Sequence, residues 1–219
     1  MKKHGVLALV LAGVMLLLCG CGGMTTDDAK DYVQSALHCG YKAEVKKYAE
    51  ITETTEKEAK KEYETNLDTI MKEAGFDDTG VSDELKADYR SMFEKMLKSA
   101  NYKVKEAKET EDDEFTVDAD YTSCLFYGLG SDCSTVSDEL DQWVTDTYSN
   151  VETIPSDEEL NEAIMRKMYE IMSAKLADPT YGDKMEKEVH VKVNKDGAYY
   201  IPNDDLTAVD DALFPQNQL

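Results

Sequence analysis

Residues 115–121 read Phe-Thr-Val-Asp-Ala-Asp-Tyr, and this alternation of apolar and polar side chains decides the fold class of the 219-residue chain. Successive side chains of a β-strand point to opposite faces, so the apolar members of this stretch share one face. The stretch that starts at Tyr102 alternates in the same way with lysines, and the acidic residues 111–114 separate the two. The pattern predicts an antiparallel hairpin with one face on the core and the other in solvent.

The sequence before this hairpin has the period of helices. Apolar residues recur at helical spacing in four segments, which lie within residues 27–100. Thr55 and Glu58 form a capping-box pattern at the start of the third segment, and Ser82 is the expected N-cap of the fourth. We therefore expect four helices ahead of the first hairpin.

The same order returns after the hairpin. Two further helical segments follow, the second of which opens with the capping-box pair Ser156 and Glu159. Alternation resumes at 189–193, and the turn Asn194-Lys-Asp-Gly197 leads to a partner strand at 198–201. A last helix completes the chain.

This order predicts an α+β fold, in which amphipathic helices pack on one face of a single antiparallel sheet. The chain reads as two helix–helix–hairpin halves, which arose either by duplication or because each half solves the same packing problem. The order of elements resembles that of the cystatin-like and NTF2-like folds.

The first residues have the parts of an export signal. Lys2 and Lys3 precede an apolar run, Gly5 to Leu18, of 14 residues, which is short for a membrane-spanning helix because that needs about 20. The run ends in Leu18-Cys19-Gly20-Cys21, which resembles the lipobox of bacterial lipoproteins. The resemblance implies cleavage between Gly20 and Cys21 and lipid on Cys21. The alternative is an ordinary secretory signal with two incidental cysteines.

We accordingly expect a cleaved signal at 1–20, a lipidated cysteine with its tether at 21–26, and one acidic domain at 27–219. The tether would keep the domain within about 20 Å of the lipid. The chain also resembles small uncharacterised lipoproteins of Gram-positive anaerobes, which implies a lipid-anchored protein at the outer face of the cell membrane.

The net charge of −22 restricts the partners of the domain. Nucleic acid is not expected, because its phosphates are bound by clustered Lys and Arg. Acidic lipid headgroups would repel the domain as well, so the bilayer is expected as a partner through the anchor alone. The charge suits cations or basic polypeptides, and it also favours solubility at a crowded surface.

Three cysteines remain after Cys21, and export permits them to form disulfides. Cys124 and Cys133 bracket a Gly-containing loop and are the expected pair. Cys39 is then an odd thiol near a helix end, where we expect it to be buried and apolar in behaviour.

No constellation of residues indicates catalysis. His38 and His190 are expected to be structural, the second on the solvent side of its strand, and no metal or other cofactor is expected. The turn at 194–197 cannot be a calcium loop, because Lys192 would occupy its first ligand position. Some of the 13 tyrosines could line a ligand pocket, although packing at the edge of the core accounts for most of them.

These observations favour a membrane-anchored, non-enzymatic module that binds a protein or small ligand or serves as a structural component. The alternative is an extracellular hydrolase of glycan or peptidoglycan that uses a pair of carboxylates. With 46 acidic residues, the sequence does not single out such a pair.

Overall fold

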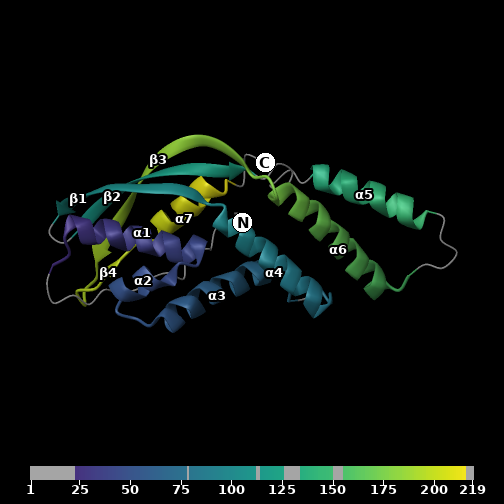
Figure 1. Cartoon of the computed structure of the whole chain (residues 1–219), viewed down its shortest axis with the longest axis horizontal. Coiled ribbons are helices and arrows are strands. Elements are labelled where there is room, and N and C mark those ends of the chain that lie inside the picture. Colours follow the sequence, from purple (N-terminus) through teal and green to yellow (C-terminus); the bar gives the residue numbers. More distant parts are fainter. Residues whose placement is uncertain (1–22, 78, 112–113, 126–133, 150–154, 216–219) are drawn as a thin grey trace.

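The computed structural model describes residues 23–77, 79–111, 114–125, 134–149 and 155–215. The fold is α+β, as expected: within these residues, seven helices accompany a four-stranded antiparallel sheet of order β1-β2-β3-β4 (Figure 1). The elements are α1 (Thr26–Lys42), α2 (Val45–Ile51), α3 (Glu56–Glu73), α4 (Asp83–Lys98), β1 (Asn101–Glu111), β2 (Glu114–Leu125), α5 (Ser134–Tyr148), α6 (Asp157–Leu176), β3 (Thr180–Val193), β4 (Tyr199–Tyr200) and α7 (Asn203–Leu213).

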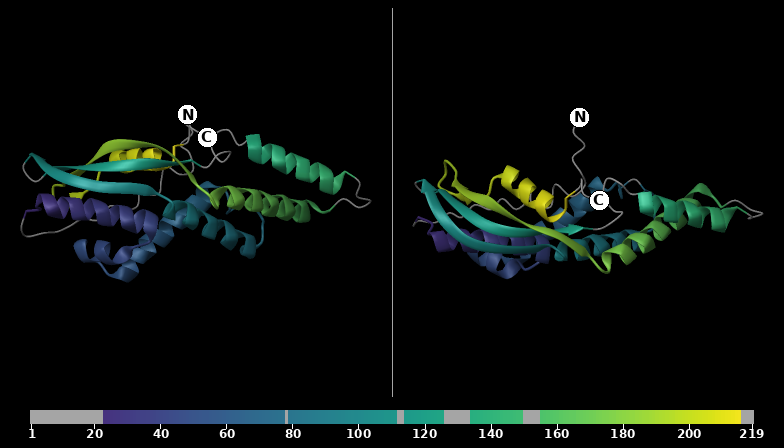
Figure 2. Two further views of the ribbon diagram at one scale, coloured as in Figure 1. Left: turned by 45° about the horizontal axis from the view of Figure 1, so that its top comes forward. Right: turned by 90° about the horizontal axis from the view of Figure 1, so that it is seen from above.

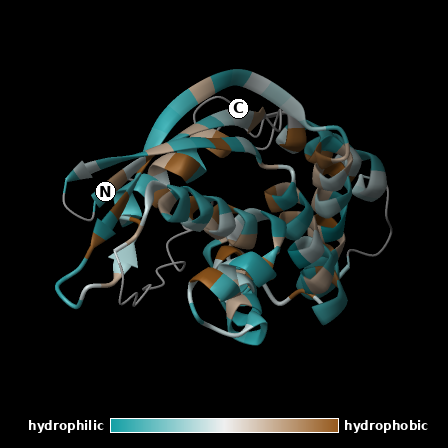
Figure 3. Ribbon diagram, turned by 60° about the vertical axis from the view of Figure 1, so that its left-hand side comes forward, coloured by the Kyte–Doolittle hydropathy of each residue, from teal (hydrophilic) through white to brown (hydrophobic). Residues whose placement is uncertain are grey.

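The predicted hairpin is formed by β1 and β2. Tyr102 lies opposite Tyr121 in the register, and Val104 lies opposite Ala119. The apolar side chains of 115–121 are all buried, with Phe115 only 2% exposed. The alternation appears as bands of hydropathy along the arched strands in Figure 3.

The sheet is completed by a strand that is longer than expected. β3 runs antiparallel to β2 from Thr180, whereas the alternation predicted a strand only from residue 189. The turn at 194–197 is confirmed: the Asn194 N–H donates to the Ala198 carbonyl, and Gly197 has a φ of +79°. A positive φ suits glycine because it has no Cβ to clash.

One face of the sheet carries the core. α1 packs on β1 and β2, and α7 packs on β2 and β3. The two helices are joined to each other, since the buried Tyr41 hydroxyl of α1 donates to Asp210 Oδ1 of α7. α2, α3 and α4 pack beyond α1 and form the layer farthest from the sheet (Figure 2).

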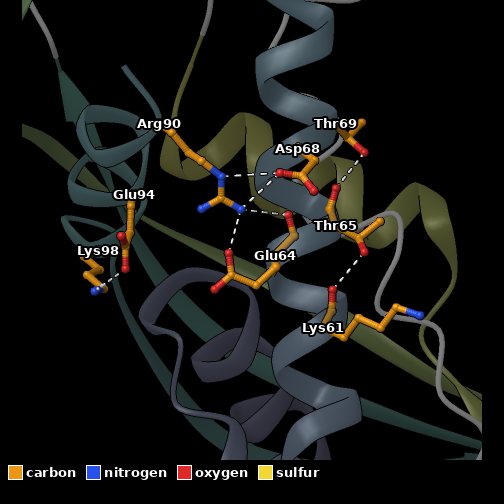
Figure 4. A network of polar contacts seen from close by, with 8 residues as sticks. All are labelled: Lys61, Glu64, Thr65, Asp68, Thr69, Arg90, Glu94 and Lys98. Atoms are coloured by element: carbon orange, nitrogen blue, oxygen red, sulfur yellow. Dashed lines mark hydrogen bonds and ion pairs between the residues drawn. The ribbon is translucent and has the colours of Figure 1, made fainter. Parts of the chain in front are cut away.

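An arginine joins the two long helices of this layer. The Arg90 guanidinium of α4 donates to Glu64 Oε2 of α3 at 2.6 Å and to Asp68 Oδ1 at 3.1 Å (Figure 4). It also reaches the Glu64 carbonyl at 3.2 Å. The three contacts fix the crossing of α3 and α4, and we assign Arg90 a structural role.

The second helix pair differs from the expected packing on the sheet. α5 packs against α6, and α6 packs against α4, so the pair forms an arm that projects from the body. In all three views of Figures 1 and 2 the arm lies at one end of the long axis, while β4 lies near the other. The α6 side chains are mostly half-buried, and Ile171 is the buried one.

Both predicted capping boxes are present. The Thr55 N–H donates to Glu58 Oε2 at 2.9 Å, and the Ser156 N–H donates to Glu159 Oε2 at 3.0 Å. These hydrogen bonds and those from the cap hydroxyls lower the pKa of both glutamates. A third box, formed by Thr25 and Asp28, starts α1.

The caps predict a pH-dependent difference in stability. A pKa that is lower in the folded state than in the unfolded state stabilises the fold above the unfolded value, and this contribution disappears as the pH falls. We expect Glu58→Gln to melt at a lower temperature than the parent at pH 7, with the gap closing towards about pH 3. Thermal unfolding followed by circular dichroism measures the gap. Glu56→Gln is the control: it removes the same charge two residues earlier, at a side chain that makes no cap hydrogen bond, so its loss in melting temperature should be smaller. A pH-independent difference for Glu58→Gln would contradict the prediction.

Candidate functional site

The N-terminal end of the domain is tied to the sheet. The Met24 backbone N–H donates to the Tyr199 hydroxyl of β4 at 2.9 Å, and the half-buried Met24 side chain packs on the core. Thr25 is the N-cap of α1, and Thr26 is already helical. Of the tether expected at Gly22–Thr26, therefore, only Gly22 and Gly23 precede the first residue held by the domain.

The predicted lipidation and cleavage positions, Cys21 and Gly20, lie outside the described residues. Cys133 does too, so its pairing with Cys124 stays a prediction. Cys124 is buried, and its Sγ lies 3.2 Å from the Ser99 hydroxyl. Cys39 is buried between α1 and α3, and burial raises the pKa of its thiol to about 12. A thiol held protonated is a poor nucleophile, which agrees with the expected apolar role.

Both histidines of the domain have structural partners. His38 Nδ1 lies 3.2 Å from Glu44 Oε2, beyond the end of α1. The His190 backbone N–H donates to Asp205 Oδ2 at 2.6 Å, and Nδ1 of the His190 ring lies 2.8 Å from the same oxygen. Asp205 thereby binds β3 to the first turn of α7.

The outer face of the sheet carries a network of alternating charges. Asp120 of β2 pairs with Lys105 at 2.6 Å and with Lys184, and Lys105 also reaches Glu186 at 2.9 Å. Hydrogen bonds from the two lysines lower the pKa of Asp120. These charges pair with one another across three strands, so ion pairs cover this part of the outer face of the sheet.

A groove of about 630 Å³ lies between α1 and α2. Its lining is polar and of mixed charge, and several of its groups are paired with each other. Lys47 lies 3.4 Å from Asp31, and His38 is bound to Glu44. Four of the groove's charged or ionisable lining residues are therefore already paired with one another.

A second groove, of about 500 Å³, lies between the two helices of the arm. Trp143, the single tryptophan of the chain, and Ile171 form its apolar part. Trp143 is half-buried and packs edge-to-face on Tyr148, with ring centroids 5.7 Å apart. The remaining lining residues are Asp138, Glu139, Gln142, Asp146 and Lys167.

The charged groups of this groove differ in how they are paired. Glu139 pairs with Lys175 at 2.9 Å, and Lys167 pairs with Glu170 at 3.1 Å. Asp146 accepts a hydrogen bond from Gln142, a neutral partner, at 2.8 Å. α5 carries four carboxylates and no lysine or arginine, so the rim of the groove has a negative excess.

Neither groove is lined by tyrosine, so the buried tyrosines serve the core and not these two sites. Burial raises the pKa of Glu62, but Glu62 lines neither groove. Among the described residues, no three His, Cys, Asp or Glu side chains gather as metal ligands would. Within the same residues, no helix combines the length and apolar character needed to cross a bilayer.

The groove of the arm was not expected from the sequence. Trp143 lies beside the apolar face of its helix, and that pattern alone is typical of a core-edge residue. The sequence signal is a tryptophan in a helix whose charged residues are all acidic. It indicates a binding site only once the structure shows that α5 and α6 project together from the body.

Comparison with known proteins shows a shared fold. No protein-family model and no curated protein matches the chain. A solved structure superposes on 87% of the chain with a TM-score of 0.54 and 18% sequence identity. It is the crystal structure of YcdA from Bacillus subtilis, described as a "putative lipoprotein". The present chain spans 58% of the length of that protein, and at this identity the likeness extends to the fold.

Proposed function

We propose that this chain is a lipid-anchored protein at the outer face of the cell membrane, and that its domain is a non-enzymatic module that binds a partner. The observation that carries the proposal is the hydrogen bond from the Met24 backbone N–H to the Tyr199 hydroxyl. It places the first held residue of the domain three positions after Cys21, the cysteine that resembles a lipidation site. The lipoprotein description of YcdA, which shares the fold, supports the anchor.

The anchor and the bond together give the domain an orientation. Three residue steps span at most about 11 Å, so Met24 would lie that close to the lipid-modified residue. β4 and the start of α1 would then face the bilayer. The α5–α6 arm, which lies at the far end of the long axis in Figure 1, would point away from it. The arm, with the groove between α5 and α6, would thus be presented outward.

A pair of cysteine variants tests the anchor. Cys21→Ser removes the thiol that would carry the lipid, and we expect it to abolish incorporation of an alkyne-labelled fatty acid and retention in the membrane fraction. Cys19→Ser is the matched control, two positions upstream, and should be labelled and retained like the parent. Labelling of Cys21→Ser, or loss of labelling in Cys19→Ser alone, would contradict the proposal.

The non-enzymatic part of the proposal is tested separately. The purified chain is incubated with peptidoglycan fragments and cell-surface glycans, and products are followed by mass spectrometry. We expect the substrates to be recovered unchanged. Turnover above that of a heat-denatured sample would favour the hydrolase alternative.

A further inference from the structure

We infer that the groove between α5 and α6 is a docking site for a basic, amphipathic segment of a partner polypeptide. This inference rests on the proposed binding function, and it names the site and the chemistry of the partner. Two features of the groove carry it: an apolar part formed by Trp143 and Ile171, and a rim of carboxylates.

The apolar part has the composition of a binding surface. Tryptophan is enriched at protein interfaces, because its large ring contributes apolar contact while its N–H can find a polar partner. Trp143 is half-buried on an arm that packs on the body through α6, so a ligand could cover it without disturbing the sheet. Ile171 is 6% exposed and forms the floor.

The rim selects the sign of the partner. Glu139 already has Lys175, and Lys167 has Glu170, so these pairs are internally neutralised. Asp138 and Asp146 add negative charge on the α5 side, and Asp141 extends it along the exposed surface of the same helix. An approaching lysine or arginine would be attracted by this excess, whereas an acidic segment would be repelled.

The length of α5 sets the size of the segment that we expect to bind. α5 has 15 residues and is therefore about 22 Å long, so a segment of similar length could lie along it. An amphipathic helix would place its apolar residues on Trp143 and its basic residues over the rim, as in other helix-in-groove complexes.

The test uses the full chain in non-ionic detergent micelles. The probe is a synthetic peptide of Lys and Leu at helical spacing, about as long as α5 and without Trp or Tyr. Because the chain has a single tryptophan, its emission reports on the groove itself. We expect a saturable change in Trp143 emission, with an affinity that falls about tenfold between low and high salt. A peptide with Glu in place of every Lys should give no change.

Two pairs of charge substitutions separate the rim from the overall charge. Asp138→Asn with Asp146→Asn should weaken binding about tenfold. Glu109→Gln with Glu111→Gln removes the same charge from exposed positions near the β1–β2 turn and should leave the affinity within about twofold. Binding of the peptide to micelles is the same for both pairs and does not affect the comparison. Equal weakening by the two pairs would overturn the inference.

A tryptophan variant tests the apolar part. Trp143→Ala should reduce the affinity for a fluorescent-labelled peptide by at least about 30-fold, with the circular dichroism of the parent retained. Unchanged affinity would overturn the inference. So would an emission change that depends on the concentration of the chain alone and is not competed by peptide, because the occupant would then be a second copy. The cysteine variants report on the anchor independently, so failure of either proposal can be recognised without the other.

Discussion

Replacing Phe115 by Ala is expected to lower the free energy of unfolding by about 3–5 kcal/mol. Phe115 is 2% exposed on the central strand β2, where it lies opposite Glu109 of β1 and Val191 of β3. Its ring centroid lies 6.4 Å from that of Tyr199. Truncation would remove apolar contacts and leave a cavity beside Tyr199, whose hydroxyl binds the Met24 N–H. Equilibrium unfolding in urea, followed by circular dichroism, measures the loss.

Two variants calibrate this result. Phe115→Leu keeps most of the apolar volume and should lose much less than Phe115→Ala. Lys103→Ala changes an exposed residue of β1 and should stay within about 0.5 kcal/mol of the parent. A loss below about 1 kcal/mol for Phe115→Ala would mean that the hairpin does not form the centre of the core.

The second large effect is expected at Tyr41, where replacement by Phe should cost about 1.5–3 kcal/mol. The Tyr41 hydroxyl donates to Asp210 Oδ1, and both residues are buried, at 0% and 2% exposure. Burial, together with the neighbouring Asp210 carboxylate, raises the pKa of Tyr41 well above its usual value, so the phenol remains a donor at neutral pH. Phenylalanine would fill the same space but deprive a buried carboxylate of this hydrogen bond.

Tyr121→Phe is the matched control. Tyr121 is equally buried, and its hydroxyl has no hydrogen-bond partner among the described residues. Deleting that hydroxyl should be neutral or slightly stabilising, because an unsatisfied polar group is removed. The two Tyr→Phe variants are compared by urea unfolding under the same conditions. Equal losses would contradict a specific role for the contact between α1 and α7.

The fold class could be predicted from the sequence because the period of apolar residues changes clearly at Tyr102 and again at residue 189. Capping pairs such as Thr55 and Glu58 marked the helix starts, since their hydrogen bonds are local. The first part of β3 could not be predicted in this way. Residues 180–188 are rich in Lys, Glu and Asp, and they form a strand because β2 supplies its hydrogen bonds and its opposite charges. That pairing is long-range and leaves little periodicity in the sequence.

The candidate site was less predictable for the same reason. Whether Trp143 belongs to a core or to a groove depends on where α5 and α6 pack, and a helix-period pattern is compatible with both. The contact of Met24 with Tyr199 joins residues 175 positions apart, so nothing near either residue indicates it. The Leu18–Cys21 junction is a local pattern, so the sequence alone supports a prediction of lipidation there. The contact that would orient an anchored domain is long-range and could not be predicted.

The hydrogen bond between Met24 and Tyr199 would affect how long a lipid-anchored form of this protein is retained at the cell surface. Proteases cut most readily at extended, exposed chain that enters their active-site cleft. In a lipid-anchored chain, Gly22 and Gly23 would be the stretch between the modified cysteine and a residue bonded to the sheet. Release of the domain by cutting there would first require that bond and the start of α1 to open. In an anchored chain, the contact that would hold the domain near the bilayer would therefore also protect it from being shed.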